Sequence, residues 1–265
     1  MRALSELSVA VARRVRVVFT DIDDTLTTDG LLEKPAFESL WRLCDAGISV
    51  VPVTGRPAGW CDHIARMWPV AGVVGENGGL FYAYDRVMRR MVRRYARDEE
   101  TRASDRAKLA LVKHEILKRV PRARVSADQP FRELDLAIDF AEDVGPLSGE
   151  EIDEIVAVFE AHGAVAKVSS IHVNGWYGTH DKVGMIKIFS LERLQIDLEA
   201  EREAAVYVGD SPNDEPAFAS FSLSVGVANV VELAGRFRTL PVYVTPSRGG
   251  RGFSELAELL LAART

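Results

Sequence analysis

Short apolar runs rich in β-branched residues alternate with helical patterns at both ends of the chain, and this alternation restricts the possible folds most strongly. VVFT (17–20), ISVVPV (48–53) and AGVVG (71–75) have the length and composition of buried strands. Between the first two, apolar residues recur at helical spacing, with Pro35 suited to a first turn and Gly47 to a C-terminal cap. AAVYVG, LSVGV and PVYVT alternate with NDEPAFASF, VVELAGRF and FSELAELLLAA near the C-terminus. This order predicts an α/β fold with a parallel sheet covered by helices on both faces.

The middle of the chain has a different pattern. FYAYDRVMRRMV predicts a hairpin, and ELDLAIDF alternates apolar and polar residues with period two. TRASDRAKLALVKHEILKRV predicts a long helix, and SGEEIDEIVAVFEAHG predicts a second one with a capping box from Ser148 to Glu151. We therefore expect a small α+β module at residues 83–177, inserted into a core formed by residues 1–82 and 178–265. In ELDLAIDF, we expect the module's helices to cover the apolar residues Leu134, Leu136, Ile138 and Phe140. We expect Asp135 and Asp139 to face the cleft or solvent.

Composition excludes several classes of protein. The chain has 265 residues, of which 47% are hydrophobic, so it can bury a sizeable core. A net charge of -6 argues against a general affinity for nucleic acid, and the arginines of RVMRRMVRRYARDEETRASDR are followed by compensating acids, as on a solvated face. Cys44 and Cys61 lack metal-ligand spacing, and we expect both in or near the core. No run approaches the ~20 apolar residues of a membrane span. We expect a cytoplasmic monomer or homodimer without nucleic-acid or membrane partners.

Three carboxylates follow the first apolar run in DIDDT. Asp21 and Asp23 are two residues apart, so both can point to one face of an extended segment while Asp24 points away. Two carboxylates held this close repel each other unless a cation, a shared proton or several donors offset the charge. An acidic turn that closes a strand is the plainer alternative, and this segment alone leaves both interpretations open.

Hydroxyl and backbone N–H groups follow the second strand. Thr54 and Gly55 lie where open parallel sheets bind ligands, and they suit a phosphate oxygen. The alternative is an ordinary turn in which Thr54 caps the next helix and Gly55 gives the backbone its freedom.

A second acidic segment, VYVGDSPNDEPAF, follows a strand near the C-terminus. Asp210 comes directly after the strand, and Asp214 lies at the start of a helix, where it could also act as a cap. With Asp21 and Asp23, these residues should converge at one edge of the sheet, and such a cluster of hard oxygens favours Mg²⁺. Lys182 could supply the positive charge that a phosphate and a carboxylate both need.

Together these segments resemble the haloacid dehalogenase-like (HAD) phosphatases, whose four motifs appear in order as DIDDT, Thr54, Lys182 and GDSPND. ENGG (76–79) and the insert between the second and third motifs are similar to the IIB subfamily, which has a larger α/β cap and includes sucrose-phosphate, mannosyl-phosphoglycerate and Cof-type sugar phosphatases. The resemblance implies a Rossmann-like core with an inserted cap. Val183 stands where many relatives have Gly after the lysine, a departure that concerns the local turn rather than the chemistry.

The same resemblance implies a function and a set of site residues. The implied enzyme is a Mg²⁺-dependent phosphatase that hydrolyses a small phosphorylated metabolite, preferably a sugar phosphate, through an aspartyl-phosphate. Asp21 is the implied nucleophile and Asp23 the implied acid and base, whereas Asp24 is expected to be structural and Thr25 to hydrogen-bond the loop. The implied metal ligands are Asp21, Asp23 through its backbone carbonyl, Asp210 and Asp214, and the implied phosphate contacts are Thr54, Gly55, Lys182 and Asn213.

Substrate binding is expected from ENGG and the insert. The candidate residues are Arg56, Glu76, Asn77, Lys167, His172 and Asn174. His172 and Asn174 share one face of IHVNGW and could bind sugar hydroxyls, although a buried or rim polar pair fits equally well. Lys167 could meet an anionic leaving group or could simply be solvated.

Features of the sequence argue against three alternative functions. A signalling receiver domain is about half this length and lacks GDSPND and the insert. A phosphomutase of the same superfamily carries a helical cap between the first two motifs, where this chain has only TTDGLLEKP. A catalytically silent binding protein would not need its catalytic positions filled, whereas in this chain every catalytic position is filled.

Overall fold

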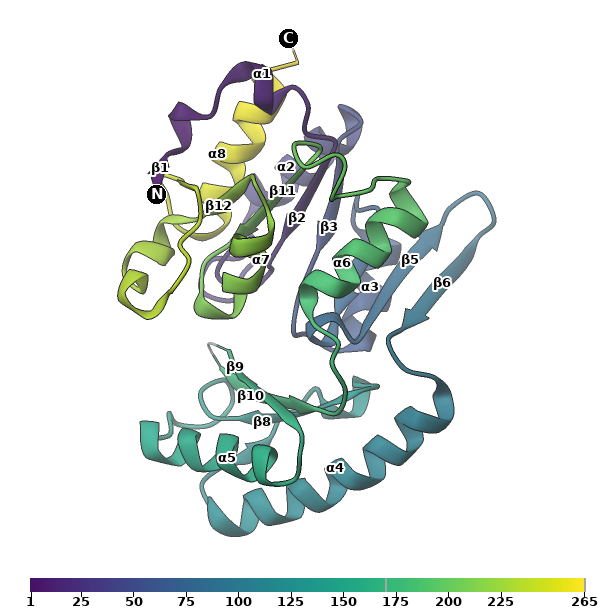
Figure 1. The fold of residues 1–265 in the computed structure, drawn as a ribbon, viewed down its shortest axis with the longest axis vertical. Coiled ribbons are helices and arrows are strands. Elements are labelled where there is room, and N and C mark those ends of the chain that lie inside the picture. The colour runs from purple at the N-terminus through teal and green to yellow at the C-terminus, as the bar shows by residue number, and fades with distance from the viewer. Residues whose placement is uncertain (170, 265) are drawn as a thin grey trace.

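The computed structural model describes residues 1–169 and 171–264; residue 170 of the predicted insert and residue 265 of the predicted core lie outside the described residues. Figure 1 shows two bodies. The larger contains both termini and a parallel sheet, and the smaller contains a second sheet with two helices on its outer side.

The large sheet has six strands in the order β1-β13-β12-β11-β2-β3, and every neighbouring pair is parallel. The strands are β1 (Arg2–Ala3), β2 (Val17–Thr20), β3 (Ser49–Pro52), β11 (Ala205–Gly209), β12 (Ser224–Gly226) and β13 (Tyr243–Val244). The predicted parallel α/β sheet is therefore confirmed. β2 lies between β3 and β11, so its C-terminal end is flanked by those of two other strands.

Alternate residues of these strands bury against helices on opposite faces, as the period of two requires. Val18, Val50 and Val206 pack in one apolar cluster with α2 (Lys34–Asp45) and α8 (Gly249–Ala262). Phe19 and Tyr207 pack in the other with α6 (Lys182–Phe189) and α7 (Glu215–Ser220). Two short helical segments, α1 (Val9–Ala12) and the π-helical turn Ser190–Leu194, complete this part of the chain.

Two predicted elements differ from the structure. AGVVG forms β4 (Val73–Gly75), but β4 pairs antiparallel with β5 (Leu80–Asp85) outside the six-stranded sheet, to which a single bridge joins Val74 and Val53. VVELAGRF forms 3₁₀ turns at Ala228–Val231 and Ala234–Arg236 instead of an α-helix. Gly235 lies within this segment, and a helix-interior glycine costs about 1 kcal/mol relative to alanine.

The predicted hairpin consists of β5 and β6 (Arg90–Tyr95), and it packs with the larger body. Phe81, Ala83 and Val92 join the apolar cluster of Phe189, while α3 (Ala58–Met67) contacts β5 from the other side. The expected boundary at residue 83 falls inside β5. We therefore propose that the insert starts after Tyr95.

The smaller body has an antiparallel sheet in the order β7-β8-β10-β9. Its elements are α4 (Glu99–Arg119), β7 (Arg124–Val125), β8 (Asp135–Asp139), α5 (Gly149–Ala161), β9 (Val165–Val168) and β10 (His172–Trp176). Residues of both helices and of β8 and β10 form one apolar cluster, including Val112, Ile138, Phe159 and Val173. The capping box of Ser148 and Glu151 is present. This body therefore has an apolar core of its own.

The expected facing of ELDLAIDF is partly wrong. Leu136, Ile138 and Phe140 face the helices as expected, but Leu134 packs with α3 and β5, because it precedes β8 at the junction of the two bodies. Asp135 and Asp139 are buried rather than solvated. Hydrogen bonds satisfy both: Asp139 accepts the backbone N–H groups of the loop that follows it, and Asp135 pairs with Arg132.

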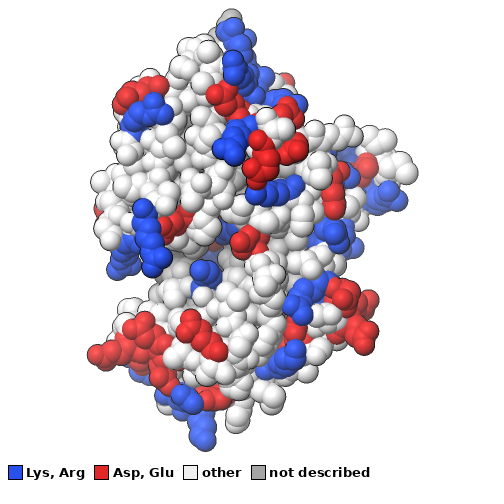
Figure 2. All heavy atoms as spheres, in the orientation of Figure 1, with Lys and Arg blue, Asp and Glu red and all other residues white. Residues whose placement is uncertain are grey.

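The surface carries charges of both signs, and Figure 2 shows them interspersed on the face it presents. Arg93 of the hairpin pairs with Asp62 at 3.1 Å, and Arg94 pairs with Glu192 at 3.4 Å, as expected of a solvated, charge-compensated face. Cys61 is buried, but Cys44 is exposed on α2, so the expectation for Cys44 was wrong. Among the described helices, none has the length and apolar character needed to cross a membrane.

Candidate active site

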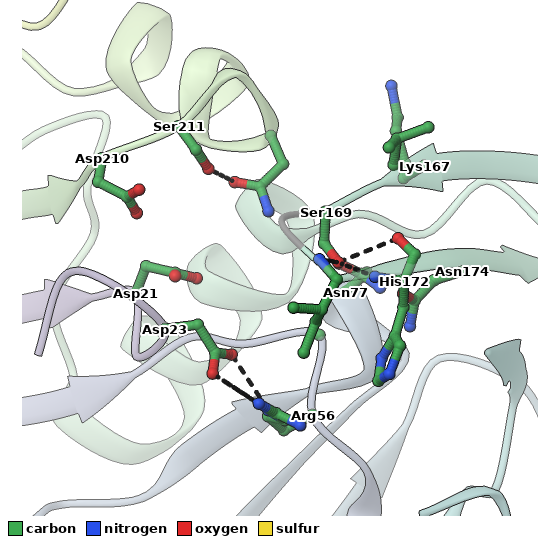
Figure 3. A pocket seen from close by; sticks show the side chains of 14 residues that line it. Asp21, Asp23, Arg56, Asn77, Lys167, Ser169, His172, Asn174, Asp210 and Ser211 are labelled. Atoms are coloured by element: carbon green, nitrogen blue, oxygen red, sulfur yellow. Dashed lines mark hydrogen bonds and ion pairs between the residues drawn. The ribbon is translucent and has the colours of Figure 1, made fainter. Parts of the chain in front are cut away.

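A cavity of about 40 Å³ lies between the C-terminal ends of the large sheet's strands and the open face of the smaller sheet. Figure 3 shows Asp21, Asp23 and Asp210 on one side of it, and Ser169, His172 and Asn174 on the other. The lining residues are Asp21, Asp23, Gly55, Arg56, Asn77, Asp210, Ser211 and Asn213 from the larger body, and Lys167, Val168, Ser169, Ile171, His172 and Asn174 from the smaller. Four expected site residues, Thr54, Glu76, Lys182 and Asp214, lie behind this surface rather than on it.

Asp21 and Lys182 form a buried ion pair. Asp21 follows β2, Lys182 opens α6, and Lys182 Nζ lies 2.7 Å from Asp21 Oδ1 and 3.0 Å from Asp214 Oδ1. Burial disfavours the charged lysine, but the attraction of Asp21 and Asp214 outweighs it and raises the pKa of Lys182. Burial, together with repulsion from Asp214 and Asp23, raises the pKa of Asp21 to about 8 despite Lys182. The site thus holds more negative charge than one lysine offsets.

Asp214 organises the loop that carries Asp210. Its two oxygens accept hydrogen bonds from Lys182, from the Tyr207 hydroxyl at 2.6 Å, and from the backbone N–H groups of Asp210 and Ser211 at 3.1 and 3.4 Å. A carboxylate offers about four lone-pair sites, so these contacts use all of them. Tyr207 was not among the expected site residues, although a tyrosine in a buried strand signals a polar partner for its hydroxyl.

Three carboxylates could hold a metal ion. One oxygen each of Asp21, Asp210 and Asp214 lie within 4.8 Å of one another. Asp210 Oδ1 accepts from the Thr25 hydroxyl at 2.8 Å, as expected for Thr25, and burial with repulsion from Asp214 and Asp21 raises the pKa of Asp210 well above its ordinary value. Buried, hard and under-compensated oxygens suit a small divalent cation. Asp21 and Asp210 each keep an oxygen that accepts no hydrogen bond from the described residues, which makes them better candidate ligands than Asp214.

Asp23 belongs to a different set of contacts that reaches into the smaller body. Its carboxylate accepts from Arg56 Nη2 at 2.9 Å and from Nε at 3.2 Å, so its side chain lies outside the metal cluster and leaves its backbone carbonyl for the expected role. Arg56 Nη1 donates to Glu142 Oε1 at 2.8 Å, and Glu142 Oε2 lies 2.9 Å from His172 Nε2. His172 and Arg56 lower the pKa of Glu142 to about 2. Sequence analysis missed Glu142, because nothing in AED distinguishes it from a solvated acid.

Glu76 joins the two bodies instead of facing the cavity, which corrects its expected role in substrate binding. Its buried carboxylate accepts the backbone N–H groups of Ala58 at 2.9 Å, Glu133 at 2.9 Å and Leu134 at 2.6 Å. Burial and the nearby Asp135 raise its pKa to about 8. These contacts tie the start of β8 to the larger body.

The rest of ENGG shapes the site. Asn77 adopts a left-handed conformation with φ of 55° and lies against Gly55, so both line the cavity as expected. Gly78 has φ of 94°, and a Cβ there would lie 1.9 Å from the carbonyl oxygen of Asp181. Only glycine allows this turn to approach the start of α6. There Asp181 caps the helix, and Val183, next to Lys182, continues it and packs in the core.

Thr54 and Asn213 have partners that bear on their expected phosphate contacts. Thr54 is fully buried, and its hydroxyl accepts from the backbone N–H of Arg56 at 3.0 Å, which leaves its own proton free to be donated. Asn213 accepts from the Ser211 hydroxyl at 2.8 Å and lines the cavity. The phosphate-binding role of these residues stays a prediction.

The expected residues of the insert meet on one face of its sheet. Lys167 on β9 pairs in register with Asn174 on β10, and Asn174 Nδ2 donates to the buried Asp135 at 3.0 Å. Lys167 is exposed, has no ion-pair partner among the described residues, and points away from His172 in Figure 3. The insert therefore presents one unpaired cation at the rim of the cavity.

The chain is similar in sequence to a protein of named activity. No protein-family model matches the chain. Over 246 residues the chain is 26% identical to a phosphoglycolate phosphatase from Methanoculleus marisnigri, covering 91% of this chain and 94% of that protein.

Solved structures show the same fold at lower sequence identity. A protein from Thermoplasma acidophilum has a TM-score of 0.71 and 20% identity, covering 92% of this chain and 99% of that one. A haloacid dehalogenase-like hydrolase from Bacteroides thetaiotaomicron has a TM-score of 0.66 and 16% identity, covering 92% and 98%. The sucrose-phosphatase from Synechocystis, solved with sucrose and phosphate, has a TM-score of 0.64 and 14% identity, covering 94% and 98%.

Proposed function

We propose that this chain, a member of the haloacid dehalogenase-like hydrolases, is a phosphatase that removes the phosphoryl group from a small metabolite through an aspartyl-phosphate on Asp21. The observation that carries the proposal is the position of Asp21: it lines the cavity, contacts Lys182 and lies beside Asp210. A nucleophile, a cation and a candidate metal ligand thus meet where a phosphoryl group would enter.

The residues divide the chemistry between two steps. Asp21 attacks phosphorus while Asp23 gives a proton to the leaving oxygen, so the P–O bond to the leaving group breaks as the bond to Asp21 forms. Asp23 then takes a proton from a water that attacks the same phosphorus, which releases phosphate and restores Asp21. Lys182, Thr54 and the N–H of Gly55 hold charge as it redistributes. Bound Mg²⁺, held by Asp21, Asp210 and the Asp23 carbonyl, would screen the repulsion between Asp21 and the phosphoryl oxygens.

Two classes of leaving group are candidates, and the residues that line the cavity bear on the choice between them. A sugar phosphate is the class that the sequence resemblance suggests. Phosphoglycolate is a second candidate, supported by the name of the curated relative and by the unpaired Lys167, which could meet its carboxylate. We retain the proposals of a cytoplasmic location and a monomer or homodimer, without nucleic-acid or membrane partners.

Metal dependence is the first expected result. The purified protein should release phosphate from at least one member of a panel of sugar phosphates and phosphoglycolate with Mg²⁺, lose this activity in EDTA, and regain it when Mg²⁺ is restored, because Lys182 alone does not offset the charge of three buried carboxylates. Asp210→Asn should require more Mg²⁺ for half-maximal activity. Full turnover in chelator would contradict the metal site, and a phosphorylated isomer in place of free phosphate would indicate a phosphomutase.

Lys167 should affect the choice of leaving group and leave phosphoryl transfer intact. Lys167→Ala should lower kcat/KM for the best substrate with an anionic leaving group, by an amount equivalent to ~1–3 kcal/mol, because one charged contact is lost. The kcat/KM for p-nitrophenyl phosphate should stay almost unchanged. Lys113→Ala, which removes an exposed lysine from α4, serves as the control and should change neither. Equal losses with both substrates would move Lys167 from recognition to the chemistry or the fold.

A further inference from the structure

Among the described residues, Glu142 is the acid of the insert that forms an ion pair with a side chain of the larger body, Arg56. It lies in the loop after β8, and its two oxygens meet two different side chains, the Arg56 guanidinium at 2.8 Å and the His172 imidazole at 2.9 Å. His172 belongs to the same body as Glu142, whereas Arg56 belongs to the other. One Glu142 oxygen thus contacts a residue of the insert, and the other contacts a residue of the larger body across the cleft.

The larger body leaves Arg56 only partly fixed. One edge of its guanidinium contacts Asp23, and its face lies 4.6 Å from the Trp60 ring centroid. Its remaining donor, Nη1, points to Glu142. Arginine carries about 2 kcal/mol of rotamer entropy, and a planar fork fixes direction only when its edges are engaged. Removing Glu142 would leave Arg56 held by Asp23 and Trp60 alone, with Nη1 unpaired.

We propose that Glu142 is a positioning residue that acts across the two bodies: with the insert closed, it holds Arg56 against Asp23 and so orients the group that transfers protons. The proposal rests on the proposed function. When the insert opens, Glu142 moves away with His172 and Arg56 loses its third contact. The catalytic arrangement is then complete only around an enclosed substrate, so attack on phosphorus and activation of water are both confined to the closed state.

The remaining contacts between the bodies allow a clean test. Arg132 Nη1 donates to the Gly55 carbonyl at 2.9 Å, and Glu76 binds the backbone of residues 133–135, so the insert stays attached when Glu142 is changed. Asp143 adjoins Glu142 in the same loop, and its side chain has no hydrogen-bond or ion-pair partner among the described residues. Asp143→Asn is therefore a matched control for the loss of a nearby charge.

Glu142→Ala should lower kcat by about 10- to 100-fold for both the best substrate and p-nitrophenyl phosphate, with KM little changed, because a misplaced proton-transfer group affects every leaving group. Glu142→Gln, which can still accept a hydrogen bond from Arg56, should lie between Glu142→Ala and wild type, and Asp143→Asn should match wild type. In the Arg56→Ala background, Glu142→Gln should cost almost nothing further, since its effect passes through Arg56.

Each other outcome overturns a defined claim. A rise in KM for the best substrate alone would make Glu142 a leaving-group contact. Additive losses in the Arg56→Ala background, or wild-type turnover in Glu142→Ala, would overturn the positioning role while leaving the phosphatase intact. Absence of phosphatase activity in the wild-type protein with Mg²⁺ would instead overturn the proposed function and this role together. The Gln variant, which keeps the volume of the side chain, supplies the comparison if Glu142→Ala folds poorly.

Discussion

Asp21→Asn is expected to abolish phosphatase turnover, by at least about 10⁴-fold, while the chain remains folded. An amide cannot form the acyl-phosphate and is a poorer metal ligand, whereas Lys182 keeps its second partner, Asp214, at 3.0 Å. The raised pKa of Asp21 sets the sign of the stability change. Without metal, ionising this buried carboxyl opposes folding increasingly from about pH 4 up to its folded-state pKa of about 8. The variant should therefore unfold at an equal or higher temperature than wild type when both are in EDTA at pH 7.

Asp24→Asn is the matched control for Asp21→Asn. Asp24 lies in the same loop with φ of 57°, a left-handed conformation that asparagine also tolerates. Its backbone accepts from Asn229 and donates to Thr27, and the substitution keeps both of these contacts. Turnover should stay within a few-fold of wild type in this variant. Near-normal activity in Asp21→Asn would remove Asp21 from the nucleophilic role.

Lys182→Ala is expected to impair both stability and catalysis. It leaves Asp21 and Asp214 buried without their shared cation, a change that typically costs 3–5 kcal/mol in the free energy of unfolding. Turnover of p-nitrophenyl phosphate and of the best metabolite should fall together, because the phosphoryl group needs this charge whatever it leaves behind. Urea unfolding and both assays measure the two effects.

Lys187→Ala is the control for Lys182→Ala, because it removes an exposed lysine from the same helix instead of a buried one. Lys187 pairs with Glu199 at 2.6 Å, but both side chains are about half exposed, and surface pairs contribute about 0–1 kcal/mol. This variant should be close to wild type in both measurements. A Lys182→Ala protein as stable as Lys187→Ala would contradict the expected cost of burying Asp21 and Asp214 without their shared cation.

The sequence predicted those parts of the site that follow from the order of strands. Asp21 and Asp210 each follow a buried strand of a parallel sheet, so their convergence needs only the topology, and β2 and β11 are indeed neighbours. Lys182 was a candidate for the positive charge of the site, but no helix was predicted at its position, and the sequence did not reveal why Gly78 must accompany it. The local sequence pattern was therefore enough to predict the edge of the sheet at which the site lies.

Contacts between the two bodies could not be predicted, because they depend on how the insert sits on the sheet. Glu76 looked like a cleft residue but binds backbone N–H groups of residues 133–135, and Glu142 looked like a solvated acid but contacts Arg56. Both are carboxylates whose partners lie far away in sequence and have no periodic signal. The proposal that the insert starts after Tyr95 has a similar basis: Ala83 and Val92 pack against the larger body through contacts that an alternating pattern does not reveal.

The position of β2 between β3 and β11 has a consequence for the order of folding. β2 can pair with β3 early in synthesis, but its other neighbour becomes available only when residues 205–209 have been made. The insert between them has a separate apolar core and can form first, and closing so long a loop costs entropy before its contacts are gained. Asp21 and Asp210 therefore meet in a late step. Repulsion between Asp21 and Asp210 therefore enters the folding pathway only when most of the chain is already present to withstand it.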